Sequence, residues 1–237
     1  MDTHLNRPGS DRIYRPYAAP AIDLGLRSFM LRVFNTMAGG LALTGVVAYA
    51  AASSGLYASI AGTPLLWLVM LAPFGLALLL GFRVSRMSPV AAQASFWGFA
   101  ALMGLSLAGI FLVYTGDGIA RVFFISAGTF AATAAWGYTT RTDLTRFGSF
   151  LVMGLIGVVL ASLVNVFVGS SALQFAVSVI GVVVFTGLTA WDTQRLKTAY
   201  LQSEGTGNLA ILGALMLYLD FVNLFVSLLQ LVGTRRD

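Results

Sequence analysis

Residues 207–232, GNLAILGALMLYLDFVNLFVSLLQLV, are the stretch that decides the fold. The stretch is long enough to cross a bilayer, because about 20 apolar residues suffice at roughly 1.5 Å per residue. At helical spacing its small and polar residues share one face: Gly213, Met216, Asp220, Asn223, Ser227 and Gln230. We expect a membrane helix with such a stripe to turn it toward a bundle interior or a watery cavity.

Asp220 lies near the middle of this stretch. A charge at bilayer depth costs at least about 2.5–3.5 kcal/mol on insertion scales, so an intramembrane aspartate is a functional candidate by default. The alternative is a structural role, as a hydrogen-bond hub to the backbone near Tyr218 or Asn223. Gly213, Met216 and Ser227 are explained more simply, as a helix-packing face.

The composition of the whole chain predicts an all-α integral membrane protein. The 237 residues are 58% hydrophobic and only 10% charged, against about 25% in a soluble domain. The chain has no cysteine, and its single histidine, His4, lies in a polar tail, so thiolate sites, histidine metal clusters and Ser-His-Asp triads are excluded. The only lysine, Lys197, lies outside the apolar segments. We therefore expect no enzyme activity, no cofactor and no nucleic-acid partner.

Seven apolar segments predict seven transmembrane helices, at residues 33–53, 64–82, 89–114, 119–138, 147–168, 171–191 and 207–232. Residues 1–28 are polar and predict a disordered cytoplasmic tail, which leaves residues 29–233 as the membrane domain. Short links suggest that the first six segments form three hairpins. The seventh then has no hairpin partner, and with its polar stripe it is expected at the centre, wrapped by the other six.

Positive charges predict the orientation in the membrane. With a cytoplasmic N-terminus, eleven of the fourteen Arg and Lys residues lie inside, and only Arg121, Arg235 and Arg236 lie outside. Arg235 and Arg236 follow the seventh segment. They are outside only if this segment spans fully, so a re-entrant segment with an internal C-terminus stays open as an alternative.

Asp192 and Asp220 are the two acidic residues in or beside the last two segments. Asp192 ends a second small and polar stripe, which consists of Gln174, Ser178, Gly181, Phe185, Thr189 and Asp192. Two carboxylates in one dehydrated site cannot both ionise cheaply, so such a pair shares a proton, binds a cation or pairs with arginine. Asp192 could instead pair with Arg195 at i+3.

The two aspartates differ in expected depth. Asp220 lies about 13 residues, or roughly 20 Å, into its segment, whereas Asp192 is at the end of its own. They meet only if the sixth helix extends toward Lys197 or the seventh begins well below the membrane surface.

The motifs around both aspartates, TAWDTQRLK at 189–197 and YLDFVNLFVSLL at 218–229, closely resemble the Bax inhibitor-1 family. The stretches GYTTRTDL at 137–144 and FGSFLVMGL at 147–155 resemble its bacterial branch, and the likeness covers about residues 28–233. The resemblance implies six helices around a seventh and a pH-sensitive calcium leak channel in the bacterial inner membrane. It also implies a di-aspartyl sensor, which maps to Asp192 and Asp220.

The same resemblance implies an arginine latch on the second helix, which maps to Arg86 and, second, to Arg83. The permeant Ca²⁺ and protons would meet Asp192, Asp220 and the polar residues Asn223 and Ser227. Such ligands are too few for a tight site of 6–8 oxygens, but conduction needs weak binding. Bacterial relatives are also described as binding a membrane-bound ATP-dependent protease, so a membrane scaffold is the alternative, and a proton-coupled transporter ranks last.

Overall fold

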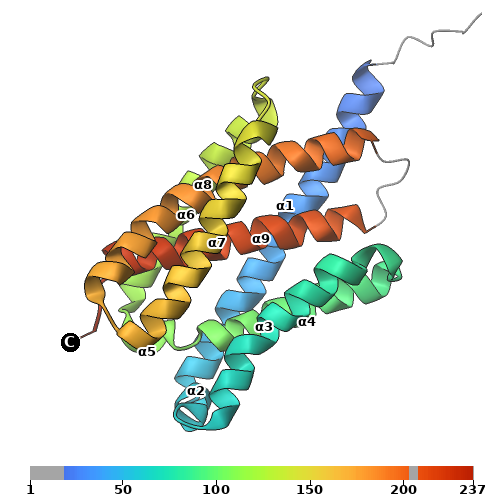
Figure 1. The fold of residues 1–237 in the computed structure, drawn as a ribbon. Helices are drawn as coiled ribbons and strands as arrows, with labels where there is room; N and C mark the ends of the chain where they lie inside the picture. Colours follow the sequence, from blue (N-terminus) through green and yellow to red (C-terminus); the bar gives the residue numbers. More distant parts are fainter. Residues whose placement is uncertain (1–18, 203–207, 237) are drawn as a thin grey trace, which may run out of the picture.

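The computed structural model describes the backbone of residues 19–202 and 208–236 and the side chains from Leu24 onward within these ranges. Seven of its helices are long and apolar enough to cross a membrane, and they lie side by side as one bundle (Figure 1). The predictions of an all-α chain and of seven membrane spans are confirmed.

The seven spanning helices are α1 (Ala19–Ser53), α3 (Pro64–Arg83), α4 (Pro89–Leu107), α6 (Gly116–Thr139), α7 (Thr145–Val168), α8 (Ser171–Gln202) and α9 (Leu209–Val232). Short helical pieces connect some of them: α2 (Leu56–Ile60), the 3₁₀ turn η1 (Val84–Arg86) and α5 (Ile110–Val113). α4 begins at the pair Ser88-Pro89: the Ser88 hydroxyl caps the helix by accepting from the backbone N–H of Ala91 at 3.2 Å, and Pro89 occupies the first helical position.

Two helices are longer than their apolar segments. α1 begins at Ala19, so it takes in the last ten residues of the predicted tail, and residues 1–18 of that tail lie outside the described part. α8 continues to Gln202 instead of ending at residue 191. The two extensions pack together, since the ring of Phe29 on α1 lies 5.0 Å from that of Tyr200 on α8. Hydropathy locates the end of the apolar segment, but it does not locate the end of the helix. Contacts between α1 and α8 stabilise further helical turns beyond the apolar segments.

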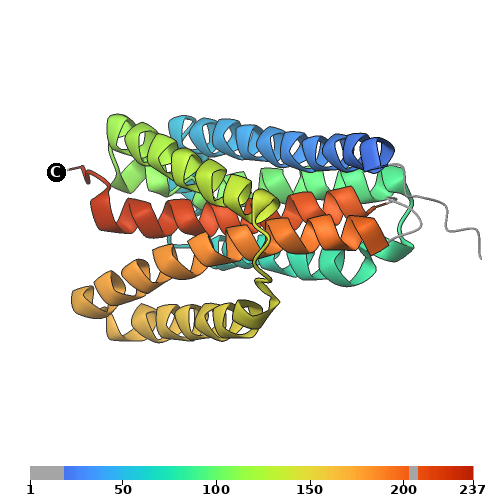
Figure 2. The same ribbon diagram turned by 90° about the horizontal axis from the view of Figure 1, so that it is seen from above.

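α9 lies inside the bundle. It packs against α1, α3, α4, α6 and α8, and twelve of its residues are buried. α7 instead packs against the outer side of α8 and has one buried residue, Gly148 (Figure 2). The expectation that all six helices wrap α9 thus needs correction at α7, because the loop from α6 places α7 beyond α8.

The C-terminal residues lie beside the link between α5 and α6. The N–H of Thr115 donates to the carbonyl of Thr234, and the N–H of Arg236 donates to that of Val113, both at 2.9 Å. This link joins the third and fourth spans, so it is on the opposite side of the bundle from the start of α9. α9 therefore crosses the bundle completely, and the re-entrant alternative is wrong.

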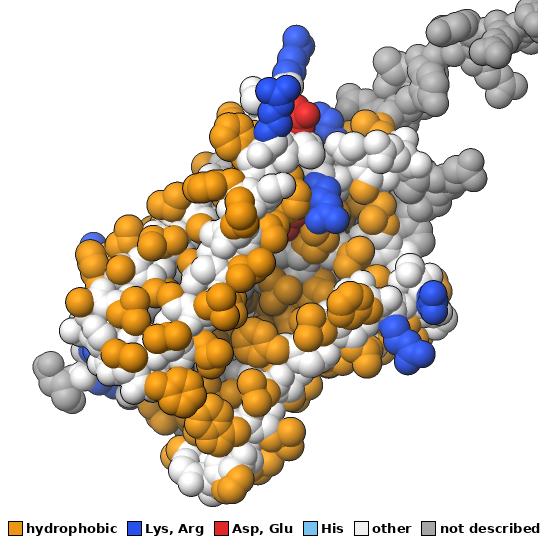
Figure 3. Space-filling model, in the orientation of Figure 1, with side chains coloured by type: hydrophobic (Ala, Val, Ile, Leu, Met, Phe, Trp, Pro, Cys, Tyr) orange, Lys and Arg blue, Asp and Glu red, His pale blue; other side chains and the backbone are white. Residues whose placement is uncertain are grey.

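On the face shown in Figure 3, hydrophobic side chains cover most of the surface, and most of the charged side chains lie toward its ends. α7 and α3 contribute the most exposed of these apolar side chains, among them Phe167 at 84% and Phe82 at 81% exposure. Such a surface is stable only against lipid, because contiguous apolar patches on soluble monomers rarely exceed a few hundred Å². The chain is an integral membrane protein.

Candidate functional site

Asp192 and Asp220 come to the same level in the bundle. Ten residues separate Asp192 from the end of α8 at Gln202, and eleven separate the start of α9 at Leu209 from Asp220. Because α8 and α9 are antiparallel neighbours, these near-equal lengths place the two aspartates opposite each other. The extension of α8 beyond Lys197, the first of the two conditions derived from the sequence, is what brings them together.

The two carboxyl groups form one buried pair. Asp192 is 7% and Asp220 5% exposed, and the charge of Asp192 acts on Asp220. Two ionised carboxylates carry only acceptors and repel each other, so a direct hydrogen bond between them would require a proton held by one of them. Asp192 Oδ1 and Asp220 Oδ2 are buried with no hydrogen-bond partner in the described part of the chain. Unpartnered buried oxygens are costly, so this pair favours a proton or a cation.

Close helix packing encloses the pair along the α8–α9 interface. On one side, a Cβ added at Gly213 would lie 2.8 Å from Leu196 Cδ2. On the other side, a Cβ added at Gly181 would lie 2.6 Å from Ser227 Oγ. The two polar stripes therefore face each other, and the packing role expected for Gly213 and Ser227 is confirmed.

The two predicted polar pathway residues, Ser227 and Asn223, have different surroundings. Ser227 lies in the α8–α9 interface, on the same face as Asp220. The side-chain amide of Asn223 donates to the carbonyl of Leu219, one turn earlier on its own helix, at 2.8 Å. Among the described side chains no group of three or more His, Cys, Asp or Glu residues could hold a metal ion. Two carboxylates suit a transient cation better than a resident one.

Arg83 and Arg86 do not reach the aspartates in this structure. Both are exposed, and neither pairs with any described carboxylate. The turn that carries Arg86 is held at the start of α9, because the side-chain amide of Asn208 donates to the carbonyls of Val84 at 2.6 Å and Met87 at 2.7 Å. Asp220 lies twelve residues further along α9, or about 18 Å. A latch between Arg86 and the pair therefore requires the end of α3 to move.

Arg195 is the cation that acts electrostatically on Asp192. Its side chain is exposed, and its guanidinium lies 5.3 Å from the centre of the Trp191 ring, where a cation–π contact holds it. The simple alternative, an ion pair of Asp192 with Arg195 at i+3, is thus replaced by stacking on Trp191. Asp192 instead turns into the bundle, toward Asp220.

Residues just beyond Asp192 hold the loop between α6 and α7. Gln194 accepts a hydrogen bond from the N–H of Leu144 and donates one to the carbonyl of Thr142, both at 2.8 Å. Lys197 donates to the carbonyl of Tyr138 at 3.0 Å. In this loop, hydrogen bonds from the Thr145 side chain and backbone hold the pKa of Asp143 below its ordinary value.

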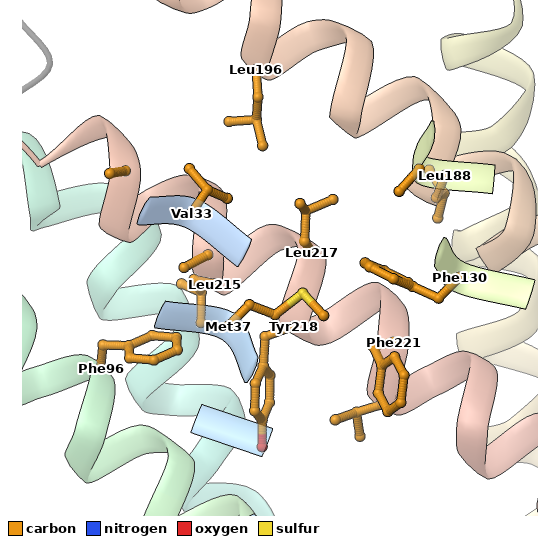
Figure 4. Packing of buried hydrophobic residues seen from close by; sticks show 14 of the residues in the cluster. Val33, Met37, Phe96, Phe130, Leu188, Leu196, Leu215, Leu217, Tyr218 and Phe221 are labelled. Carbon is orange, nitrogen blue, oxygen red and sulfur yellow. The ribbon is translucent and has the colours of Figure 1, made fainter. Parts of the chain in front are cut away.

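A second polar cluster lies inside the bundle, at Thr44 and Tyr218, and sequence reasoning missed it. Their hydroxyl groups are 2.5 Å apart, and Thr44 also donates to the carbonyl of Ala100 on α4 at 2.8 Å. Figure 4 shows the Tyr218 ring directed from α9 at α1. The available signal was the tyrosine itself, because a Tyr hydroxyl in the middle of an apolar span needs a partner.

Seven apolar spans around an enclosed pair of carboxyl groups define a polytopic membrane protein with an acidic site inside its bundle. A family model described as "Inhibitor of apoptosis-promoting Bax1" matches residues 26–237. The chain belongs to this family, the Bax inhibitor-1 family, and the resemblance seen in the sequence is confirmed.

Similar proteins occur in several bacteria. An uncharacterized protein of Rickettsia prowazekii is 48% identical over 91% of this chain and 93% of its own length. The inner membrane protein YbhL of Escherichia coli (strain K12) is 44% identical, over 97% of this chain and 98% of its own. An uncharacterized membrane protein of Streptococcus pyogenes is 34% identical over 89% and 94%. These relatives match the membrane domain at nearly full length.

Proposed function

We propose that the protein is a pH-sensitive cation leak channel of a bacterial inner membrane, with Ca²⁺ as its permeant ion. The observation that carries the proposal is the pair of aspartates enclosed between two membrane spans. Carboxylates at bilayer depth are expensive, and in membrane proteins they mark ion pathways and proton relays. The membrane assignment is supported by the relative named as an inner membrane protein.

Proton sharing between Asp192 and Asp220 is the proposed sensor. With one shared proton the pair keeps one negative charge, to which Arg86, or Arg83 in its place, is attracted when the end of α3 swings inward. A second proton removes that charge and with it the attraction. The end of α3 then moves away, and a path opens along the polar stripe of α9 that includes Ser227. The leak is therefore expected to increase as the pH falls.

Purified protein in liposomes that are prepared without Ca²⁺ and then placed in a Ca²⁺-containing buffer tests the channel directly. A fluorescent Ca²⁺ indicator inside the liposomes should report an influx that exceeds that of empty liposomes and grows on acidification. Influx equal to that of empty liposomes at every pH would reject the channel. Influx that saturates with a counter-transported solute would identify a transporter instead.

Asn208 gives a test of the α3 movement. Asn208→Ala removes two hydrogen bonds that hold the α3–α4 turn at the start of α9. Each such bond contributes about 0.5–1.5 kcal/mol, so the equilibrium between closed and open states should shift by about tenfold. Because these bonds hold the end of α3 away from the aspartate pair, their loss favours the latched, closed state. We therefore expect the Ca²⁺ leak at neutral pH to fall by about that factor in the liposome assay.

Asn165→Ala is the matched control for this variant. The Asn165 side chain accepts a hydrogen bond from the N–H of Ser170 at 3.0 Å, in the turn between α7 and α8 and away from α3. Its leak should equal that of the unaltered protein. Equal leaks in both variants would show that the α3–α4 turn does not control the path.

The alternative function is a membrane scaffold that binds a membrane-bound protease or another membrane complex. It is favoured by a polar hollow of about 610 Å³ at the connector end of α8, lined by charged residues that include Asp143, Arg195 and Lys197. The basic tail, residues 1–18 of which lie outside the described residues, is the sequence feature to which we assign partner binding. Deleting residues 1–18, which precede α1, should abolish co-purification of such a partner and leave the Ca²⁺ leak unchanged. Loss of both together would show that the two roles are not separate.

A further inference from the structure

An apolar groove runs along the outer side of the bundle between α1 and α6. Both helices pack against α9, and the ring of Phe221 on α9 forms part of the floor. The groove has a volume of about 660 Å³, within the range of about 300–1,000 Å³ typical of ligand sites. Every residue that lines it is apolar or glycine. Its lining suits a hydrophobic ligand.

Small residues leave this space open. Ala38, Ala42 and Gly45 line it from α1, and Ala120 and Ala127 line it from α6. A Cβ added at Gly45 would meet nothing within 4 Å. The groove adjoins a cavity of about 100 Å³, which shares Gly45 with the groove and is also lined by Thr44. A long, flexible chain fits this shape better than a compact molecule.

The surroundings decide what fills the groove. Its walls belong to two membrane-spanning helices, so at this depth the neighbouring molecules are lipid acyl chains. Water in an apolar groove finds no hydrogen-bond partner on the lining side chains. If the groove is empty, its lining side chains lose dispersion contacts. An acyl chain satisfies both conditions.

Three arginines gather at the end of the groove where α6 begins. Arg121 is in the second turn of α6, close to the groove residue Ala120, and is exposed. The exposed Arg235 lies 5.9 Å from the ring centre of Tyr114, and Arg236 donates from Nε to the carbonyl of Tyr114 at 3.2 Å. Among the described side chains at this end the three arginines outnumber the one carboxylate, Asp117, while Asp237, which follows Arg236, lies outside the described residues. These arginines are also the three that the positive-inside rule leaves unexplained.

We propose that this groove binds one anionic phospholipid, with an acyl chain between α1 and α6 and its phosphate headgroup at Arg121 and Arg235. The long shape of the groove selects against compact ligands, and the arginines select for a negatively charged headgroup. The site is separate from the aspartate pair, and it does not depend on ion conduction. A second copy of this protein would be a different occupant, and the experiment below distinguishes the two.

Native mass spectrometry of the detergent-purified protein tests this site. The protein is titrated with phosphatidylglycerol and, separately, with phosphatidylcholine that carries the same acyl chains. We expect one retained lipid, with a clear preference for phosphatidylglycerol. A protein dimer without bound lipid, or equal retention of the two lipids, would overturn the proposal.

Two pairs of variants locate the lipid. Gly45→Leu fills the groove and should abolish the retained lipid, whereas Gly157→Leu, at an equally open position on α7, should not.

Arg121→Gln combined with Arg235→Gln should weaken phosphatidylglycerol binding by about fivefold for each arginine and leave phosphatidylcholine binding unchanged. The control is Arg141→Gln combined with Arg146→Gln, at the other end of the bundle. Equal effects within either pair would place the lipid elsewhere.

Discussion

Asp220→Asn is expected to remove most of the pH dependence of the Ca²⁺ leak. The substitution keeps the shape of the side chain and supplies an N–H in place of the shared proton, so the new side-chain amide can donate a hydrogen bond to Asp192. It leaves a single carboxyl group in the site, and Asp192 can stay ionised without a like charge beside it. Opening of the proposed channel then requires protonation of Asp192 alone, which without a like charge beside it occurs at lower pH.

The size of this effect follows from the number of protons involved. A leak controlled by one titrating group changes by at most about tenfold per pH unit. The variant should change by less than about twofold over roughly pH 6–8, and it should stay near the neutral-pH leak of the unaltered protein. Liposome influx measured at several pH values gives the two profiles. Asp192→Asn should give the same flat profile.

Asp143→Asn is the control for this experiment, because Asp143 is an exposed carboxylate in the loop between α6 and α7. Its profile should match that of the unaltered protein. A full pH response in both Asp220→Asn and Asp192→Asn would mean that the pair is structural. In that case the sensor must be sought in other residues.

Gly137→Ala is expected to destabilise the bundle strongly. A Cβ at Gly137 would clash with the backbone of Ala190 on α8, lying 2.8 Å from its Cα and closer still to its carbonyl oxygen. Neither backbone can yield without separating α6 from α8. Overpacking of this kind costs about 1–3 kcal/mol, so thermal unfolding in detergent should occur at a clearly lower temperature. Because Ala190 precedes Asp192 by two residues, the aspartate pair should also be displaced.

Gly128→Ala is the matched control, since it lies on the same helix and a Cβ there would meet nothing within 4 Å. Alanine favours a helix more than glycine does, so this variant should be as stable as the unaltered protein or more so. Equal destabilisation by the two variants would show that glycine content, rather than the contact with Ala190, determines stability.

The membrane architecture was predictable from the sequence because it depends on local composition. Twenty or so apolar residues suffice to define a span wherever they pack, and all seven predicted spans are present. The capping of α4 by Ser88 was predictable for the same reason, since the cap and its partner are three residues apart. The helix ends were less predictable. α8 runs on to Gln202 through polar residues, because its extension packs against the start of α1.

The aspartates themselves were also recognisable, because a charge in an apolar segment is costly wherever the segment lies. Their pairing was not derivable from spacing alone, since it depends on how far α8 continues beyond Asp192. The contacts of Asn208 with the α3–α4 turn and of Tyr218 with Thr44 were missed. They join residues 121–174 positions apart in the chain, and nothing in the local sequence identifies the partner.

By itself the sequence of residues 207–232 determined that α9 is apolar and long enough to cross a membrane and carries one costly carboxylate on a polar face. The tertiary structure alone decided which helix meets that face and where the C-terminal residues lie. It also decided that the turn that carries Arg86 is held at Asn208, about 18 Å along α9 from Asp220. The physical reason is that burial cost is a property of each residue, whereas pairing, helix length and lateral grooves follow from the packing of distant segments against one another.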